Sequence, residues 1–264
     1  MSTDQPADEP ETMPSSKRRR VDPTNTRPGL LFLARLAGSC RRYEHMYHYM
    51  RSLVQLITPD QPLTSEERNC FATACCSHVK RRQDAYNFIA QAAADPRRTD
   101  QRQREAAMDY LSLISLEIHV ACMDIVRTID LHLLPQTDGP PVSADDLVLY
   151  KLLKGNFLMC VADVKGGMEK HTYTTAAIEC FESAMVDGKD LPSSSSAGLS
   201  LQYSRAVLYS SAYGQPHKGY KIAQEAFNSA RLELEVLEER PAEEAARALK
   251  TLLHFLDARK MYAS

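Results

Sequence analysis

Apolar residues recur at spacings of three and four along most of the chain after residue 30, which is the spacing of one face of an α-helix. The clearest stripe consists of Leu111, Ile114, Ile118, Ala121, Ile125 and Ile129. A wider stripe from Leu149 to Val164 predicts a helix that is buried on more than one side. A third, from Ala223 to Leu237, contains small residues that let neighbouring helices approach closely. The pattern predicts an all-α fold of about nine helices and no convincing strand.

The signals between the stripes agree with helices joined by short connections. Thr64 offers a side-chain cap at a helix start, and Glu67 stands three residues later, which is the spacing of a capping box. Three segments are predicted as connections between helices: 58–62, 135–141 and 188–196. The serines at the end of the last segment are expected to be mobile.

The amino-terminal end has a different composition. Residues 1–28 are rich in Pro, Ser, Asp and Glu and nearly lack large apolar side chains, so we expect a disordered tail followed by one helical domain, 29–264. The tail contains a basic run made of Lys17, Arg18, Arg19 and Arg20. Such a run is either a solvated stretch of charge or a nuclear-import signal that binds an acidic receptor groove, and the sequence leaves both interpretations open.

Composition excludes several classes of function. Apolar residues make up 44 % of the chain, enough for a sizeable core, and a formal net charge of -2 gives no basic field for nucleic acid. The longest apolar stretch, 111–126, is interrupted by Glu117, His119 and Asp124, so we expect no membrane span. Seven cysteines without a CxxC pair or a preceding signal peptide indicate a reduced, cytoplasmic location. If the basic run acts in import, the protein also enters the nucleus.

Several segments resemble the 14-3-3 protein family in order along the chain. The strongest likenesses are in 42–46, 63–69, 154–156, 198–201 and 223–237. The resemblance extends from about residue 34 to 257. It implies nine antiparallel helices that form a cup-shaped groove, and an adapter that binds protein or peptide clients.

The resemblance also implies a dimer. In that family an arginine of one subunit pairs with a glutamate of the other beside tyrosines, and the matching residues here are Arg42, Tyr43, Tyr110 and Glu117. An arginine and a glutamate can form a forked, charge-assisted hydrogen-bond pair, although these charges are also readily explained as solvated surface groups. A second family pair, an acid with a lysine, becomes His45 and Leu113. The expected assembly is a homodimer or a heterodimer with another 14-3-3-like chain.

The family's phosphate-gripping side chains are absent. The family holds phosphoserine through a lysine and an arginine on its third helix and an arginine–tyrosine pair on its fifth. Alignment without gaps places Cys76, Gln83, Met159 and Cys160 at these four positions. The asparagine that holds the ligand's backbone becomes Gln202. Because a phosphate with nearly two negative charges is best met by guanidinium groups and a phenol, we expect a degenerate pocket and altered or phosphate-independent binding.

Three cations near these positions are candidates for partial compensation. Lys80 lies one turn beyond Cys76, Arg205 one turn beyond Gln202, and Lys154 at the groove rim. They either contact an acidic or unphosphorylated peptide, or are solvated or paired with local acids. The candidates for the apolar floor of the groove are Leu152, Met159, Leu201 and Leu252.

The remaining chemistry favours no enzyme, cofactor or metal. Cys76 and Cys160 replace groups that touch one phosphate in the family, so their thiols are expected to be close; free thiols in the core are favoured over a metal site or redox pair. No nucleophile–base pair or phosphate-binding Gly-rich loop is recognisable. Two alternatives stay open: a tetratricopeptide-like adapter, although no repeat of about 34 residues is found, and a non-binding subunit that dimerises with competent 14-3-3 proteins.

Overall fold

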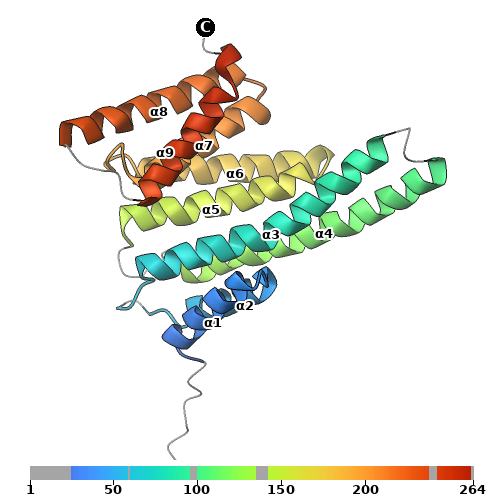
Figure 1. The fold of residues 1–264 in the computed structure, drawn as a ribbon, viewed down its shortest axis with the longest axis horizontal. Helices are drawn as coiled ribbons and strands as arrows, with labels where there is room; N and C mark the ends of the chain where they lie inside the picture. Colours follow the sequence, from blue (N-terminus) through green and yellow to red (C-terminus); the bar gives the residue numbers. More distant parts are fainter. Residues whose placement is uncertain (1–24, 59, 96–99, 135–141, 238–242, 263–264) are drawn as a thin grey trace, which may run out of the picture.

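Nine α-helices account for almost all of the described chain. The computed structural model describes residues 25–58, 60–95, 100–134, 142–237 and 243–262. The helices, shown in Figure 1, are α1 (Arg27–Ser39), α2 (Tyr43–Val54), α3 (Ser65–Ala94), α4 (Gln101–His132), α5 (Ala144–Asp163), α6 (Gly167–Asp187), α7 (Ser196–Ser211), α8 (Pro216–Leu237) and α9 (Glu243–Asp257), followed by the short 3-10 helix η2 (Lys260–Tyr262). The predicted all-α class is confirmed, because these ranges contain helices and no named strand.

Side-chain caps fix the starts of several helices, among them α3 and α7. The predicted capping box at α3 is present, since the Thr64 hydroxyl accepts from the backbone N–H of Glu67 and the Glu67 carboxylate accepts from that of Thr64. Ser195 caps α7 by accepting from the backbone N–H of Gly198, and the backbone N–H of Ser194 donates to Glu233 at 2.8 Å. The serine run that was expected to be mobile is therefore held in place.

The first helix begins at Arg27, inside the tail that the sequence predicted. Pro28 sits in the first turn, where its missing N–H costs no helical hydrogen bond. The Arg27 guanidinium is anchored by the Glu67 carboxylate and donates to the carbonyl oxygens of Gln61, at 2.7 Å, and Pro62, at 2.9 Å. These contacts place Arg27 and Pro28 in the helical domain. The basic run 17–20 lies outside the described residues.

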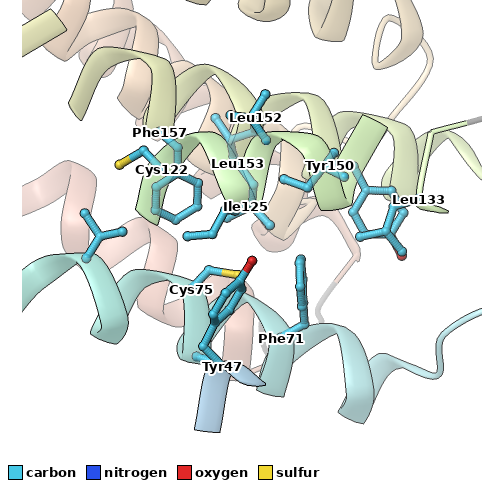
Figure 2. Packing of buried hydrophobic residues seen from close by; sticks show 14 of the residues in the cluster. Tyr47, Phe71, Cys75, Cys122, Ile125, Leu133, Tyr150, Leu152, Leu153 and Phe157 are labelled. Atoms are coloured by element: carbon cyan, nitrogen blue, oxygen red, sulfur yellow. The ribbon is translucent and has the colours of Figure 1, made fainter. Parts of the chain in front are cut away.

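The elements form two adjoining cores. Helices α3 and α4 make a long antiparallel pair, and α5 lies between them and α6 (Figure 1). In the larger core, Phe71 of α3 points toward Ile125 of α4 and Leu153 of α5 (Figure 2). The smaller core joins α7, α8 and α9 through Leu199, Ala206, Tyr220, Ala223, Ala230, Ala245, Leu252, Phe255 and Leu256.

Within the described ranges, helix α4 is the one place where the expectation of no membrane-spanning segment needs correction. An 18-residue window of Gln101–His132 has a mean hydropathy of 1.3, so length and composition alone would suffice to span a bilayer. Its predicted stripe is nevertheless buried in the bundle, and Asp124 accepts from the Tyr47 hydroxyl at 2.9 Å and pairs with Arg51 at 3.2 Å. These contacts show that α4 packs as one helix of the bundle, and its outer face carries exposed apolar side chains.

Helices α3 and α5 are tied at their amino-terminal ends by an ion pair. The Arg68 guanidinium donates to the carboxylate of Asp146, which is 9 % exposed. Further along α5, the Phe181 ring of α6 packs directly against Gly155, where an added Cβ would lie 2.5 Å from the ring. This close approach requires glycine, so α6 packs tightly against the helix that carries the predicted pocket positions.

Candidate functional site

A cavity of about 560 Å³ opens where α3, α5, α7 and α9 meet. Gln83 lines it from α3, Met159 and Cys160 from α5, Tyr203 from α7 and Thr251 from α9. The rest of the wall is Leu152, Asn156, Asp163, Phe181, Ser200, Ser204, Val207, Leu208, Ser211 and Ala248. We call this space the main cavity. Mixed apolar and neutral polar walls of this kind suit a peptide segment whose backbone needs hydrogen-bond partners.

The main cavity carries no lining cation. Its described wall contains no Lys, Arg or His, and its single ionisable carboxyl is Asp163. Partial burial raises the pKa of Asp163, and the nearby Lys170 opposes that rise. When Asp163 is ionised, the cavity therefore presents negative charge to a ligand.

Four of the predicted groove residues line the main cavity: Leu152, Gln83, Met159 and Cys160. Cys76 is not part of this wall, but its thiol is close enough to Cys160 for the two to interact electrostatically. Desolvation, and then the neighbouring Cys160, raise the pKa of Cys76. The structure thus brings Gln83, Met159 and Cys160 to one cavity, with Cys76 close to Cys160; these are the four positions that the sequence comparison predicted to replace the family's phosphate-holding residues.

The predicted residues of α7 and α9 lie elsewhere. Leu201, Gln202 and Arg205 line a second cavity of about 380 Å³ between the α6–α7 connection, α7 and α8. Leu201 is 2 % exposed and packs into the larger core, and Leu252 is wholly buried in the smaller one. Apolar residues are spread around α7, so their spacing does not determine which face meets the main cavity. The structure turns Ser200, Tyr203, Ser204 and Val207 toward it.

The three candidate cations do not converge. The Lys80 ammonium pairs with Asp84 on its own helix at 2.8 Å, and Lys154 pairs with Asp130 of α4 at 2.7 Å. The Arg205 guanidinium donates to the Gln202 side chain at 2.9 Å, beside the second cavity. None of the three lines the main cavity. The interpretation in which they are paired locally agrees with these contacts.

An arginine next to Gln83 is also directed away from the cavity. The Arg82 guanidinium donates to the His78 backbone carbonyl at 2.9 Å and pairs with Glu117 of α4 at 3.5 Å. Glu44 of α2 lies 4.0 Å from it. Arg82 therefore joins α2, α3 and α4 and does not offer its charge to a ligand in the main cavity.

Cys160 has a partner that the sequence reasoning missed. Its thiol interacts with the buried Cys122 of α4 and with the Gln83 side chain. The interaction with Cys122, against the effect of burial, holds the pKa of Cys160 below its ordinary value, and the same interaction raises the pKa of Cys122. Cys122 could have been found from its place beside Ala121 on the buried stripe of α4. The described residues hold no group of three potential metal ligands.

The residues expected at a dimer contact lie around α2 and α4. Arg42 is exposed, with its guanidinium 3.4 Å from the His45 ring nitrogen, and Arg81 lies over the Tyr43 ring at 5.6 Å. Tyr110 is 53 % exposed. Glu117 is exposed as well, although it also pairs with Arg82 of its own chain.

Comparison with known proteins places these features in context. The family model described as 14-3-3 protein matches residues 33–257. The chain is similar to the 14-3-3-like protein G-BOX factor 14 kappa of Arabidopsis thaliana, at 28 % identity over 82 % of this chain and 86 % of that protein. It is also similar to Protein BMH2 of Saccharomyces cerevisiae, at 26 % identity over 82 % of this chain and 78 % of that protein. The checkpoint signal transducer rad24 of Schizosaccharomyces pombe is 26 % identical over the same shares, 82 % and 78 %.

Proposed function

The chain belongs to the 14-3-3 family, and from that premise we propose that it binds client peptides in the main cavity without requiring a phosphate. Proteins of this family are non-enzymatic adapters that bind protein clients and form dimers. The family membership sets aside the tetratricopeptide-like alternative. The proposal concerns the kind of peptide that this member accepts.

The observation that carries the proposal is the absence of any cation from the described wall of the main cavity. A phosphoserine brings nearly two negative charges, and binding it requires cationic donors to replace the water that it loses. Here the four relevant positions offer an amide, a thioether and two thiols, and Asp163 adds a carboxylate. A phosphate in this place would be desolvated without compensation, so neutral or basic peptide side chains are favoured.

The wall instead offers adaptable apolar surface and neutral hydrogen-bonding groups. Met159 and Cys160 are polarisable, and Met159 can change rotamer to follow different side chains. Asn156 of α5 and Thr251 of α9 line the cavity and can serve a peptide backbone as donors and acceptors. A client that presents an extended segment with apolar side chains would find both kinds of contact.

A dimer is the second part of the proposal. Outward-facing apolar side chains on two helices support it: Phe32 and Leu36 of α1, and Leu113, Leu116 and Val120 of α4, each more than half exposed. Large apolar side chains exposed in this number on α1 and on α4 indicate surfaces that associate with another chain. Arg42 and Glu117 would contribute the pair between subunits, with Glu117 shared between Arg42 of the other chain and Arg82 of its own.

The same surface favours a second candidate function. A chain that dimerises but lacks phosphate-binding cations can pair with a phosphate-competent 14-3-3 protein and halve the number of its functional grooves. The cytoplasmic location and the use of the basic run 17–20 for nuclear import are predictions that are compatible with both functions.

The decisive experiment compares the full-length chain with three matched peptide libraries that contain phosphoserine, serine or glutamate at one fixed position. We expect peptides to be selected from the serine library at least as well as from the phosphoserine library. Tight binding confined to phosphoserine would refute the proposal. If no library is bound, native mass spectrometry of a mixture with a 14-3-3 protein that keeps the four phosphate-gripping residues tests the second function, which requires a mixed dimer.

A further inference from the structure

The second cavity differs from the main cavity in its extent. The main cavity shares Ser200 and Thr251 with a smaller hollow that reaches Glu244, so the two spaces continue into each other. The second cavity shares no lining residue with the main cavity or with that hollow. Its volume of about 380 Å³ is within the range of ~300–1,000 Å³ that small-molecule sites have. The second cavity therefore suits a compact ligand, whereas a peptide segment would need a space that continues at both ends.

Much of the wall of the second cavity is apolar. The apolar side chains come from α6, from the α6–α7 connection, from α7 and from α8: Met185, Leu191, Leu199, Leu201, Ile222 and Ala226. A ligand that places an apolar body against these side chains removes apolar surface of both partners from water, which favours binding.

Arg205 brings a guanidinium group to this apolar wall. Its side chain is half-buried, and the guanidinium donates to the Gln202 side-chain oxygen at 2.9 Å. The Gln202 amide in turn donates to the sulfur of Met185 at 3.5 Å. In the part of the chain that the structure describes, no carboxylate forms an ion pair with Arg205. Because a guanidinium has five N–H donors in a planar fork, one hydrogen bond to a neutral amide leaves donors and the whole positive charge for a ligand.

The other charged groups of the second cavity are balanced by their neighbours. Glu225 pairs with Lys221 on its own helix at 3.8 Å, and Lys189 lies 3.9 Å from Asp190. All four side chains are largely exposed, so water screens these charges. Within the described wall, Arg205 is thus the one charge without an opposite partner, and it compensates a single negative charge. A phosphate carries nearly two and would need a further cation.

We propose that the second cavity binds a small apolar acid, whose carboxylate pairs with Arg205 and whose apolar body lies against Leu201 and Ile222. The two carboxylate oxygens match two N–H groups of one guanidinium, and Gln202 holds that guanidinium in place. The proposal goes beyond peptide binding and does not depend on it. Helix α7 presents different residues to the two cavities, and the test contains no peptide.

Methyl NMR of the full-length protein tests the proposal. Protein labelled at its methionine methyl groups is titrated at pH 7 with octanoate and hydrocinnamate, and with the neutral amide of each acid. Met185 lines the second cavity and Met159 the main cavity, so their signals, assigned with Met185→Leu and Met159→Leu, report where a ligand binds. We expect at least one acid to shift the Met185 signal and not that of Met159, with an affinity about tenfold above that of its amide. Shifts at Met159 alone, equal affinities of acid and amide, or no shift with either acid would overturn the proposal.

Variants of Arg205 separate the charge from the apolar wall. Arg205→Gln should lower the affinity for the acid to that for its amide, and Arg205→Lys, which keeps the charge without the fork, should give an intermediate value. The matched control is Arg231→Gln on α8, because Arg231 is exposed, pairs with Glu235 at 3.6 Å and does not line the second cavity. An acid preference that survives in Arg205→Gln, or that falls equally in Arg231→Gln, would contradict the assignment. If a variant of Arg205 does not fold, the comparison of acid and amide on the wild-type protein decides.

Discussion

Two polar contacts between α3 and α5 have opposite chemistry. At their amino-terminal ends, Arg68 forms an ion pair with the buried carboxylate of Asp146. About four helical turns further along both helices, the Gln83 side chain interacts with the Cys160 thiol, and both residues line the main cavity. The first contact is charged and internal, and the second is neutral and faces a ligand space.

The difference separates charges that hold the fold together from charges that would serve a ligand. Arg68 and Arg27 are satisfied by carboxylates of the same chain, so their retention requires no partner molecule. A cation at position 83 or 159 would face the cavity and depend on a bound anion for compensation. The described residues contain charges of the former kind, and the described wall of the main cavity has no cation of the latter kind, which is what the proposed function requires.

Removing the ion pair between Arg68 and Asp146 should have the largest effect, a loss of folding stability. Arg68→Ala leaves the Asp146 carboxylate buried without its charged donor, and we expect a loss of about 3 kcal/mol in the free energy of unfolding. Chemical denaturation monitored by circular dichroism measures it. The control is Arg247→Ala, whose pair with Glu243 is largely exposed at 3.5 Å, and which should cost less than about 0.5 kcal/mol. Equal losses in the two variants would contradict the distinction drawn between buried and exposed pairs.

Placing arginines in the wall of the main cavity should give the protein a preference for phosphorylated peptides. Gln83→Arg combined with Met159→Arg adds two guanidinium groups to the wall of the main cavity. Charged hydrogen bonds contribute about 1.5–3 kcal/mol each, so we expect the preference for a phosphoserine peptide over its serine form to rise by a factor of about ten or more. Fluorescence anisotropy with the two peptides measures the ratio.

The matched control for that experiment is Gln202→Arg, the same substitution in the second cavity on the other side of α7. It should leave the preference unchanged. A gain in phosphate selectivity from Gln202→Arg alone would mean that α7 turns this position toward the bound peptide.

Parts of the helical scaffold could be predicted from the sequence alone. The stripe from Leu111 to Ile129 and the Thr64–Glu67 capping box predicted helices that the structure confirms, because periodicity and caps are local properties. The helical domain was predicted to begin at residue 29, whereas α1 begins at Arg27. Arg27 is held by the carbonyl groups of 61 and 62, and such long-range contacts leave no local pattern.

The site was only partly predictable for a related reason. Gln83, Met159 and Cys160 were matched to family positions from likenesses on their own helices, at 63–69 and 154–156, and these three residues do line one cavity. Leu201, Gln202 and Arg205 lie on α7, where apolar residues on several sides leave the helix's rotation undetermined by sequence. Cys122 was visible only as a core residue, because its contact with Cys160 depends on how α4 and α5 pack.

Acid should weaken the amino-terminal contacts of α3. Burial tends to raise the pKa of Glu67, but hydrogen bonds from Arg27 and the Thr64 backbone lower it overall. A carboxyl with a depressed folded-state pKa stabilises the fold above its unfolded value, near 4.5, and that contribution is lost as pH falls through the folded pKa. Glu67→Gln should cost about 1 kcal/mol at pH 7 and reduce the loss of stability on acidification. Urea unfolding between pH 3 and pH 7 compares the slopes, and parallel curves would contradict this role of Glu67.

The smallest expected effect concerns the carboxylate of the main cavity. Asp163 repels an acidic peptide when ionised, and Asp163→Asn should improve binding of a glutamate-containing peptide by roughly twofold, since a partly solvated charge contributes about 0.2–1 kcal/mol. Because partial burial raises the pKa of Asp163, the wild-type protein should approach the variant as pH falls, at a higher pH than an ordinary aspartate would give. Anisotropy titrations at several pH values measure this convergence. Asp187→Asn, which removes the partner of Lys151 outside the cavity wall, is the control and should leave peptide affinity unchanged. If the two variants alter affinity equally, the effect arises from net charge, and the main cavity is not where the peptide binds.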